Sequence, residues 1–191
     1  MKLVAGLGNV PVSRYGDTRH NVGFGVLDAL ARRHGLRFDP APVNAVQADW
    51  RRVDETVWLI KPLTLMNLSG EAVGSLSRYY KVAVPDVLVV CDDVNLPLGR
   101  LRARSSGSEG GHNGLRSIAQ HLGTTEYARL RVGVGRGDVR RDLADHVLAR
   151  FEAEERSGMD DAITRAADAV ELWISDGLAR VMNTFNRVED T

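Results

Sequence analysis

Val87-Leu88-Val89-Val90-Cys91 is the longest clean apolar run in the chain, and Asp92 and Asp93 follow it directly. A run of this length rich in β-branched residues predicts an apolar strand. It is far too short for a membrane-spanning helix, which needs about 18 consecutive apolar residues. The sequence therefore predicts a strand that delivers two carboxylates at its carboxyl end.

Strand-like and helix-like segments alternate on either side of this strand in the sequence. Strands are expected at residues 2–7, 44–53, 56–60, 87–91, 101–104 and 129–134. Helices are expected at residues 22–34, 70–80, 113–122, 152–175 and 178–187, with Ser69 as the N-cap of the second and Gly35 and Gly123 as terminators. This order predicts one α/β/α domain over residues 1–191, with a twisted mixed β-sheet flanked by helices.

The composition is that of an ordinary globular protein. The 191 residues are 43% hydrophobic and 26% charged, and the single cysteine, Cys91, excludes an internal disulfide. The apolar stretch at the N-terminus is too short for a signal peptide. A cytoplasmic protein without a membrane anchor is the expectation, because a lone cysteine fits a reducing compartment.

Charge is balanced over the whole chain but distributed unevenly along it. Residues 1–150 carry 21 Lys and Arg against 15 Asp and Glu, whereas residues 151–191 carry 4 against 10. The stretch from Arg100 to Arg141 holds nine arginines against three acidic residues. Arginine's planar guanidinium suits phosphate, but this protein uses arginine almost everywhere in place of lysine. A phosphate-binding surface and a solvated basic face are both compatible with this pattern.

Polar side chains collect where the expected strands end. Their types are histidine, carboxylate and carboxamide, and they comprise Asn9, His20, Asn67, Asp92, Asp93, His112 and Asn113. A histidine held by a carboxylate can take a proton from water, and asparagine amides can stabilise a developing oxyanion. The set indicates a hydrolase in which water attacks directly, without a covalent intermediate. Asp92 and Asp93 together also permit a metal-dependent hydrolase, because carboxylates are ligands for Mg²⁺.

Six runs of sequence, taken in order, resemble bacterial peptidyl-tRNA hydrolases. The runs are Gly6-Leu7-Gly8-Asn9, Thr18-Arg19-His20-Asn21-Val22-Gly23, Lys61-Pro62 with Met66-Asn67-Leu68-Ser69-Gly70, Asp92-Asp93 with Leu96-Pro97-x-Gly99, Gly110-Gly111-His112-Asn113-Gly114-Leu115, and Arg129-Leu130-Arg131-Val132-Gly133-Val134-Gly135. The resemblance spans about residues 3 to 186. It implies a monomeric α/β/α enzyme that cleaves the ester between peptide and tRNA without a cofactor or metal.

The resemblance also assigns roles residue by residue. It implies that His20 is the general base, that Asp92 holds it, and that Asn67 and Asn113 position substrate and water. It further implies that Asn9 distinguishes an N-blocked peptide from a free aminoacyl group. Substrate contacts are implied for six more residues: Tyr15 and Leu65 on the tRNA, Met66 in the same cleft, and Arg102, Arg104 and Arg131 on the phosphates of the tRNA end.

One stretch departs from the family's pattern. The family reads Gly-Asn-Pro-Gly, whereas this chain reads Gly8-Asn9-Val10-Pro11-Val12, and one additional residue precedes Tyr15. Three further points stay open. His112 is either an orienting residue of the site or structural support. Residues 152–187 are either a lid over the cleft or a static cover of the sheet. For the function of the whole protein, the alternative is RNA binding without hydrolysis.

Overall fold

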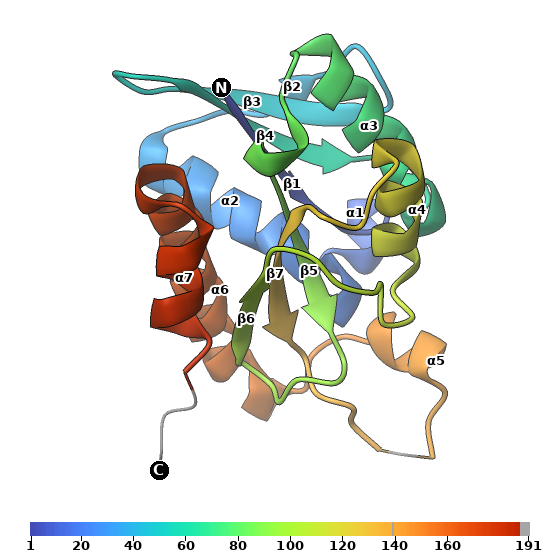
Figure 1. The fold of residues 1–191 in the computed structure, drawn as a ribbon. Helices are drawn as coiled ribbons and strands as arrows, with labels where there is room; N and C mark the ends of the chain where they lie inside the picture. Colours follow the sequence, from blue (N-terminus) through green and yellow to red (C-terminus); the bar gives the residue numbers. More distant parts are fainter. Residues whose placement is uncertain (139, 188–191) are drawn as a thin grey trace.

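The computed structural model describes residues 1–138 and 140–187, which form a mixed sheet with helices on both faces (Figure 1). Within those residues the sheet has seven strands in the order β2-β3-β4-β1-β5-β7-β6. The strands are β1 (Lys2–Gly6), β2 (Asp39–Pro40), β3 (Ala45–Arg51), β4 (Thr56–Pro62), β5 (Val87–Asp93), β6 (Leu101–Arg104) and β7 (Ala128–Gly133). β1 pairs in parallel with β4 and β5, and β5 in parallel with β7. The antiparallel pairs are β2–β3, β3–β4 and β6–β7, so the expected mixed sheet is confirmed.

Helices cover the two faces of this sheet. They are α1 (Val12–Tyr15), α2 (Val22–His34), α3 (Ser69–Tyr79), α4 (Asn113–Leu122), α5 (Leu143–Val147), α6 (Ala153–Asp176) and α7 (Leu178–Phe185). Short 3-10 turns lie at η1 (Arg19–Asn21), η2 (Met66–Leu68) and η3 (Val84–Asp86). Side chains of α2 and α6 share one apolar core with the sheet, and those of α3 and α4 share the other. The helices expected at 22–34, 113–122 and after residue 152 are therefore confirmed to within two residues.

β5 explains why its sequence is apolar throughout. Leu88 and Val90 point into the core beneath α2 and α6, whereas Val87, Val89 and Cys91 point into the core beneath α3 and α4. Successive side chains of a strand project to opposite faces, so a strand covered on both faces must be apolar at every position. The apolar run ends at Cys91, and Asp92 and Asp93 complete β5 at its carboxyl end.

The N-cap expected at Ser69 is wrong. The 3-10 turn η2 runs directly into α3, which makes Ser69 the first residue of the helix and leaves Leu68 at the N-cap. The Ser69 hydroxyl donates to the Met66 carbonyl at 2.8 Å, within the turn before the helix. Gly35 and Gly123 do end their helices as expected, with φ angles of 62° and 72°.

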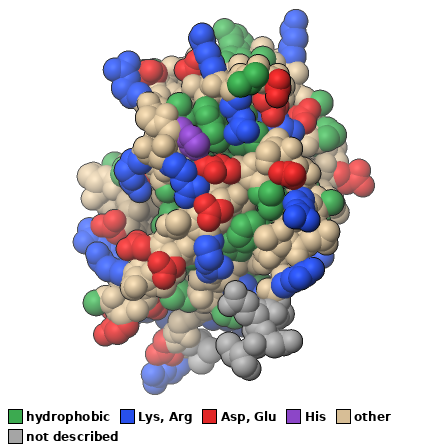
Figure 2. Space-filling model, turned by 90° about the vertical axis from the view of Figure 1, so that its left-hand side faces the viewer, with side chains coloured by type: hydrophobic (Ala, Val, Ile, Leu, Met, Phe, Trp, Pro, Cys, Tyr) green, Lys and Arg blue, Asp and Glu red, His purple; other side chains and the backbone are tan. Residues whose placement is uncertain are grey.

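The C-terminal helices close one side of the molecule. α6 packs on α2, and α7 packs on α6 and on the edge strand β6. Just beyond α7, the side-chain amide of Asn186 accepts from the Ala103 N–H at 2.7 Å and donates to the Ala103 carbonyl at 2.9 Å. Acidic and basic side chains are interspersed on the face of the molecule that includes α6 and α7 (Figure 2). None of the helices among the described residues combines the length and apolar character needed to cross a membrane.

Candidate active site

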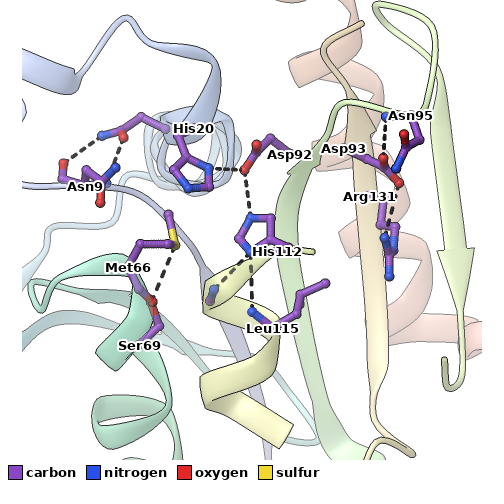
Figure 3. A network of polar contacts seen from close by, with 12 residues as sticks. Asn9, His20, Met66, Ser69, Asp92, Asp93, Asn95, His112, Leu115 and Arg131 are labelled. Carbon is purple, nitrogen blue, oxygen red and sulfur yellow. Dashed lines mark hydrogen bonds and ion pairs between the residues drawn. The ribbon is translucent and has the colours of Figure 1, made fainter. Parts of the chain in front are cut away.

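A cleft of about 430 Å³ lies beyond the carboxyl ends of β1 and β5. Because these strands are parallel neighbours, the loop after β1 and the end of β5 meet at the same edge of the sheet. The cleft is lined by Asn9, His20, Asp92, Asn113 and Arg131, all of which the sequence predicted as site residues. Figure 3 shows His20 and Asp92 pointing toward one another from separate elements.

His20 and Asp92 are in direct contact. Nδ1 of His20, on η1, lies 2.7 Å from Oδ1 of Asp92, at the end of β5, and Asp92 is 3% exposed. Burial acts to lower the pKa of His20, but the charge of Asp92 and its hydrogen bond outweigh burial and raise that pKa. With Nδ1–H donated to Asp92, Nε2 of His20 carries a lone pair. The pair thus presents a basic nitrogen at the cleft.

The Asp92 carboxylate is kept ionised. Burial acts to raise its pKa, but the charges of His20 and His112 and their hydrogen bonds hold the pKa well below its usual range. His112 contributes through Nε2, which lies 2.9 Å from the same Oδ1 atom that His20 contacts (Figure 3). A single carboxylate oxygen therefore accepts from two imidazoles.

His112 has a second contact that fixes its tautomer. It is the N-cap of α4, and its Nδ1 accepts from the backbone N–H groups of Gly114 at 3.1 Å and Leu115 at 3.4 Å. A nitrogen that accepts cannot carry a proton, so the proton of neutral His112 resides on Nε2 and points at Asp92. The two readings left open for this residue coincide, because it both caps the helix and contacts the site. Histidine is not a typical N-cap, so the sequence carried no signal for this.

The geometry bears on the metal alternative. The ligand atoms of His20, Asp92 and His112 lie within 4.8 Å of one another. A metal on Nε2 of His112 would require its proton to move to Nδ1, where two backbone N–H groups already point. Asp93 faces away from Asp92: its Oδ2 lies 3.3 Å from Arg131, and its Oδ1 accepts from the Asn95 N–H (Figure 3). Asp92 and Asp93 therefore do not form the paired ligand set of the metal-dependent alternative.

Asn9 keeps its place in the cleft despite the altered sequence that follows it. The side chain of Asn21 accepts from the Asn9 N–H at 2.8 Å and donates to the Asn9 carbonyl at 3.0 Å. This reciprocal clamp holds the Asn9 backbone against η1, the turn that carries His20. The departure after Asn9 therefore leaves it in the cleft beside His20.

The remaining expected contacts lie outside this cleft. Tyr15 is half-buried at the end of α1, and Leu65 is 64% exposed before η2. Asn67 is exposed on η2, whereas Met66 on the same turn is 6% exposed and packs in the core. Tyr15 ends α1, and the other three residues lie on η2 or directly before it. None of the four is among the residues that line the 430 Å³ cleft.

The three predicted arginines share a second groove. Arg102, Arg104 and Arg131 line it together with residues 105–108, and Arg131 lines both this groove and the cleft. Arg102 and Arg104 are exposed at alternate positions of β6, with Arg131 opposite Arg102 in register. Neither exposed arginine forms an ion pair within the described ranges, whereas Arg131 contacts Asp93. Arg136, which sequence reasoning did not single out, also lines the cleft.

The fold and the cleft define the class of protein: an α/β protein with a histidine–aspartate pair typical of hydrolases. Residues 3–191 match the family model described as peptidyl-tRNA hydrolase. The chain is 48% identical to the peptidyl-tRNA hydrolase of Chloroflexus aurantiacus over 97% of this chain and 99% of that one. It is 45% identical to the peptidyl-tRNA hydrolase of Halalkalibacterium halodurans, over 97% of this chain and all of that protein.

A solved structure agrees with these relatives. The crystal structure of peptidyl-tRNA hydrolase from Acinetobacter baumannii matches with a TM-score of 0.90 at 34% identity, over 97% of this chain and 94% of that one. The chain belongs to the peptidyl-tRNA hydrolase family, and the hydrolase class expected from its sequence is confirmed. A nucleosidase from Arabidopsis thaliana, at 8% identity and a TM-score of 0.54, shares only the fold.

Proposed function

We propose that the protein hydrolyses the ester between tRNA and a peptide or N-blocked aminoacyl group, and so recycles tRNA from peptidyl-tRNA released early from ribosomes. The observation that carries the proposal is the contact between His20 and Asp92 at the wall of an open cleft. The family relationship supplies the substrate class. The proposal places the reaction in the cytoplasm and assigns it to a monomer that needs no metal or cofactor.

In this mechanism His20 acts as general base through Nε2. It takes a proton from a water molecule, whose oxygen attacks the ester carbonyl and forms a tetrahedral oxyanion. When the carbon–oxygen bond to the ribose breaks, His20 returns the proton to the departing ribose oxygen. Asp92 holds the tautomer and stabilises the imidazolium, and such base catalysis contributes about 10²–10⁴ in rate.

The carboxamides and arginines bind the substrate around this centre. We assign Asn113 and Asn67 to positioning the substrate and water, with Asn113 at the cleft itself. Asn9 is assigned to selecting an N-blocked group, because it lines the cleft with His20 and its backbone is held by Asn21. The tRNA contacts are assigned to Tyr15 and Leu65, and the phosphate contacts to Arg102, Arg104 and Arg131. Met66 of η2 packs in the core and is assigned no direct contact.

The C-terminal segment 152–187 has two proposed roles, a lid and a static cover. Met159, Ala166 and Val170 of α6 are buried in the core shared with the sheet. Moving α6 would expose this apolar surface to water, which is unfavourable. The packing therefore supports the static cover.

The test is incubation with an N-acetylated aminoacyl-tRNA. Wild-type protein should release the blocked amino acid, and His20→Ala should lose nearly all turnover while it retains affinity for tRNA. His34→Ala is a matched control, because His34 pairs with Glu171 on α6, away from the cleft. Binding without release by the wild type would establish the binding-only alternative, and activity lost in excess chelator would establish the metal-dependent one.

A further inference from the structure

Arg19 precedes the proposed base in the chain, yet it lies inside the protein and is 2% exposed. Its guanidinium donates to the carbonyls of Ala149, at 3.3 Å, and Arg150, at 2.6 Å. It also donates to Oε2 of Glu155 at 2.7 Å. A buried cation of this kind cannot reach a phosphate on the surface, so it has no direct part in binding tRNA.

The partners of Arg19 belong to the junction between α5 and α6. Ala149 and Arg150 follow α5, and the backbone N–H of Arg19 also donates to the Ala149 carbonyl at 3.2 Å. Glu155 lies in the first turn of α6, where its side chain completes a capping box with Glu152. One guanidinium thus joins the turn that carries His20 to the end of α5 and to the start of α6.

α5 and the residue that follows it form part of the wall of the cleft. Leu143, Ala144, Val147 and Leu148 line the same cleft as His20. The position of His20 relative to this wall is therefore set by whatever fixes η1 to the segment after α5. The contacts of Arg19 do this, together with the backbone bridge between Thr18 and Arg150.

We propose that Arg19 and Glu155 form a positioning pair that fixes the catalytic histidine in register with the α5 wall of the cleft. The inference rests on the proposed function and adds to it a residue that acts through His20. Arginine suits this place because its planar fork serves three acceptors at once, whereas a lysine ammonium cannot span the same set. Glu155 compensates the buried charge, since an unpaired buried cation is strongly destabilising.

The experiment compares Arg19→Met, Arg19→Lys and Glu155→Gln with the wild type in the blocked aminoacyl-tRNA assay. Arg19→Met should lower kcat by about tenfold to a hundredfold, because displacements of about 1 Å at a reacting group have effects of this size. Affinity for tRNA should stay unchanged, and Arg19→Lys should recover part of kcat. Glu152→Ala is the matched control, because it removes one half of the capping box and leaves the ion pair in place.

Two further readouts separate positioning from stability alone. Amides of residues 143–150 should exchange with solvent faster in folded Arg19→Met, which reports loosening of the wall. The acid limb of the kcat/KM profile should move to lower pH if His20 drifts from Asp92. The other charged groups around His20, namely Asp93, His112, Arg131 and Arg136, stay in place in these variants.

Several results would overturn the proposal that Arg19 and Glu155 position His20. They are an unchanged kcat in folded Arg19→Met, a loss confined to tRNA affinity, or an equal loss in Glu152→Ala. If the arginine variants do not fold, Glu155→Gln decides, because its amide oxygen can still cap α6 while the charge is gone; unchanged kcat there overturns the proposal. A wild-type protein that releases nothing would overturn the proposed function instead, and hydrogen exchange would still test the contact.

Discussion

His20 and His112 donate to the same carboxylate oxygen, Oδ1 of Asp92, and the centroids of their rings lie 4.9 Å apart. His112 is tied to the N-terminus of α4 and His20 to η1, so Asp92 links two elements that are 92 residues apart in the chain. The shared oxygen holds both rings in defined tautomers. The site is consequently a hydrogen-bonded unit rather than a pair with an accessory residue.

The first prediction concerns Asp92→Asn. The pKa of His20 is raised in the folded protein, so kcat/KM of the wild type should fall as the pH drops through that raised value and protonates the base. Removing the carboxylate charge lowers the pKa of His20, and the acid limb should move to lower pH. Turnover on the plateau should drop by about 10²–10⁴, because the tautomer is no longer held. A pH–rate profile with an unmoved acid limb would contradict this assignment.

The second prediction separates the two contacts of His112. His112→Ala removes the N-cap of α4 and should cost about 1 kcal/mol in the free energy of unfolding. His112→Asn restores a good N-cap but is too short to contact Asp92. Stability, measured by urea denaturation, should return in the asparagine variant. Turnover should stay as low as in His112→Ala, because neither variant contacts Asp92. Recovery of both quantities together would mean that His112 serves only the helix.

The third prediction concerns salt. If Arg104 contacts a phosphate, Arg104→Ala should flatten the plot of log K for tRNA against log salt by about 0.7 to 1 unit. Arg131 already contacts Asp93, so Arg131→Ala should change the slope less. Arg51→Ala on β3 is the control, because that exposed side chain pairs with Asp49 away from the groove. Equal slopes for Arg104→Ala and wild type would remove Arg104 from the interface.

The fourth prediction concerns two glycines. A Cβ on Gly70 would lie 2.1 Å from the backbone oxygen of Ser117, where α3 meets α4. Gly70→Ala should therefore destabilise the protein by about 1–3 kcal/mol and weaken turnover, since α4 carries Asn113. A Cβ on Gly158 of α6 would meet only Leu98, at 3.7 Å, so Gly158→Ala should stabilise by about 0.5–1 kcal/mol. Thermal unfolding of both variants measures these changes in stability. An unchanged stability in Gly70→Ala would show that α3 and α4 can move apart to accept the methyl group.

Much of this arrangement could be predicted from the sequence, because the signals are local. The apolar run 87–91 defines β5, and the rule that parallel strands end together brings Asp92 toward the loops after β1. The contacts of His112 could not be predicted, because they depend on how the start of α4 packs against the end of β5. α5 has only five residues, too few for a helical period to be visible. Arg19 lies within a motif that His20 dominates, and nothing local shows that its side chain turns inward.

The amide of Asn186 has a consequence beyond its two hydrogen bonds with Ala103. β6 ends the sheet, and an open strand edge is a template on which another chain can add a strand and begin aggregation. By occupying both backbone groups of Ala103, Asn186 withholds that template from neighbouring molecules. Asn186, just beyond α7, thus shields one position of the β6 edge, and we expect a chain truncated before Asn186 to self-associate more readily.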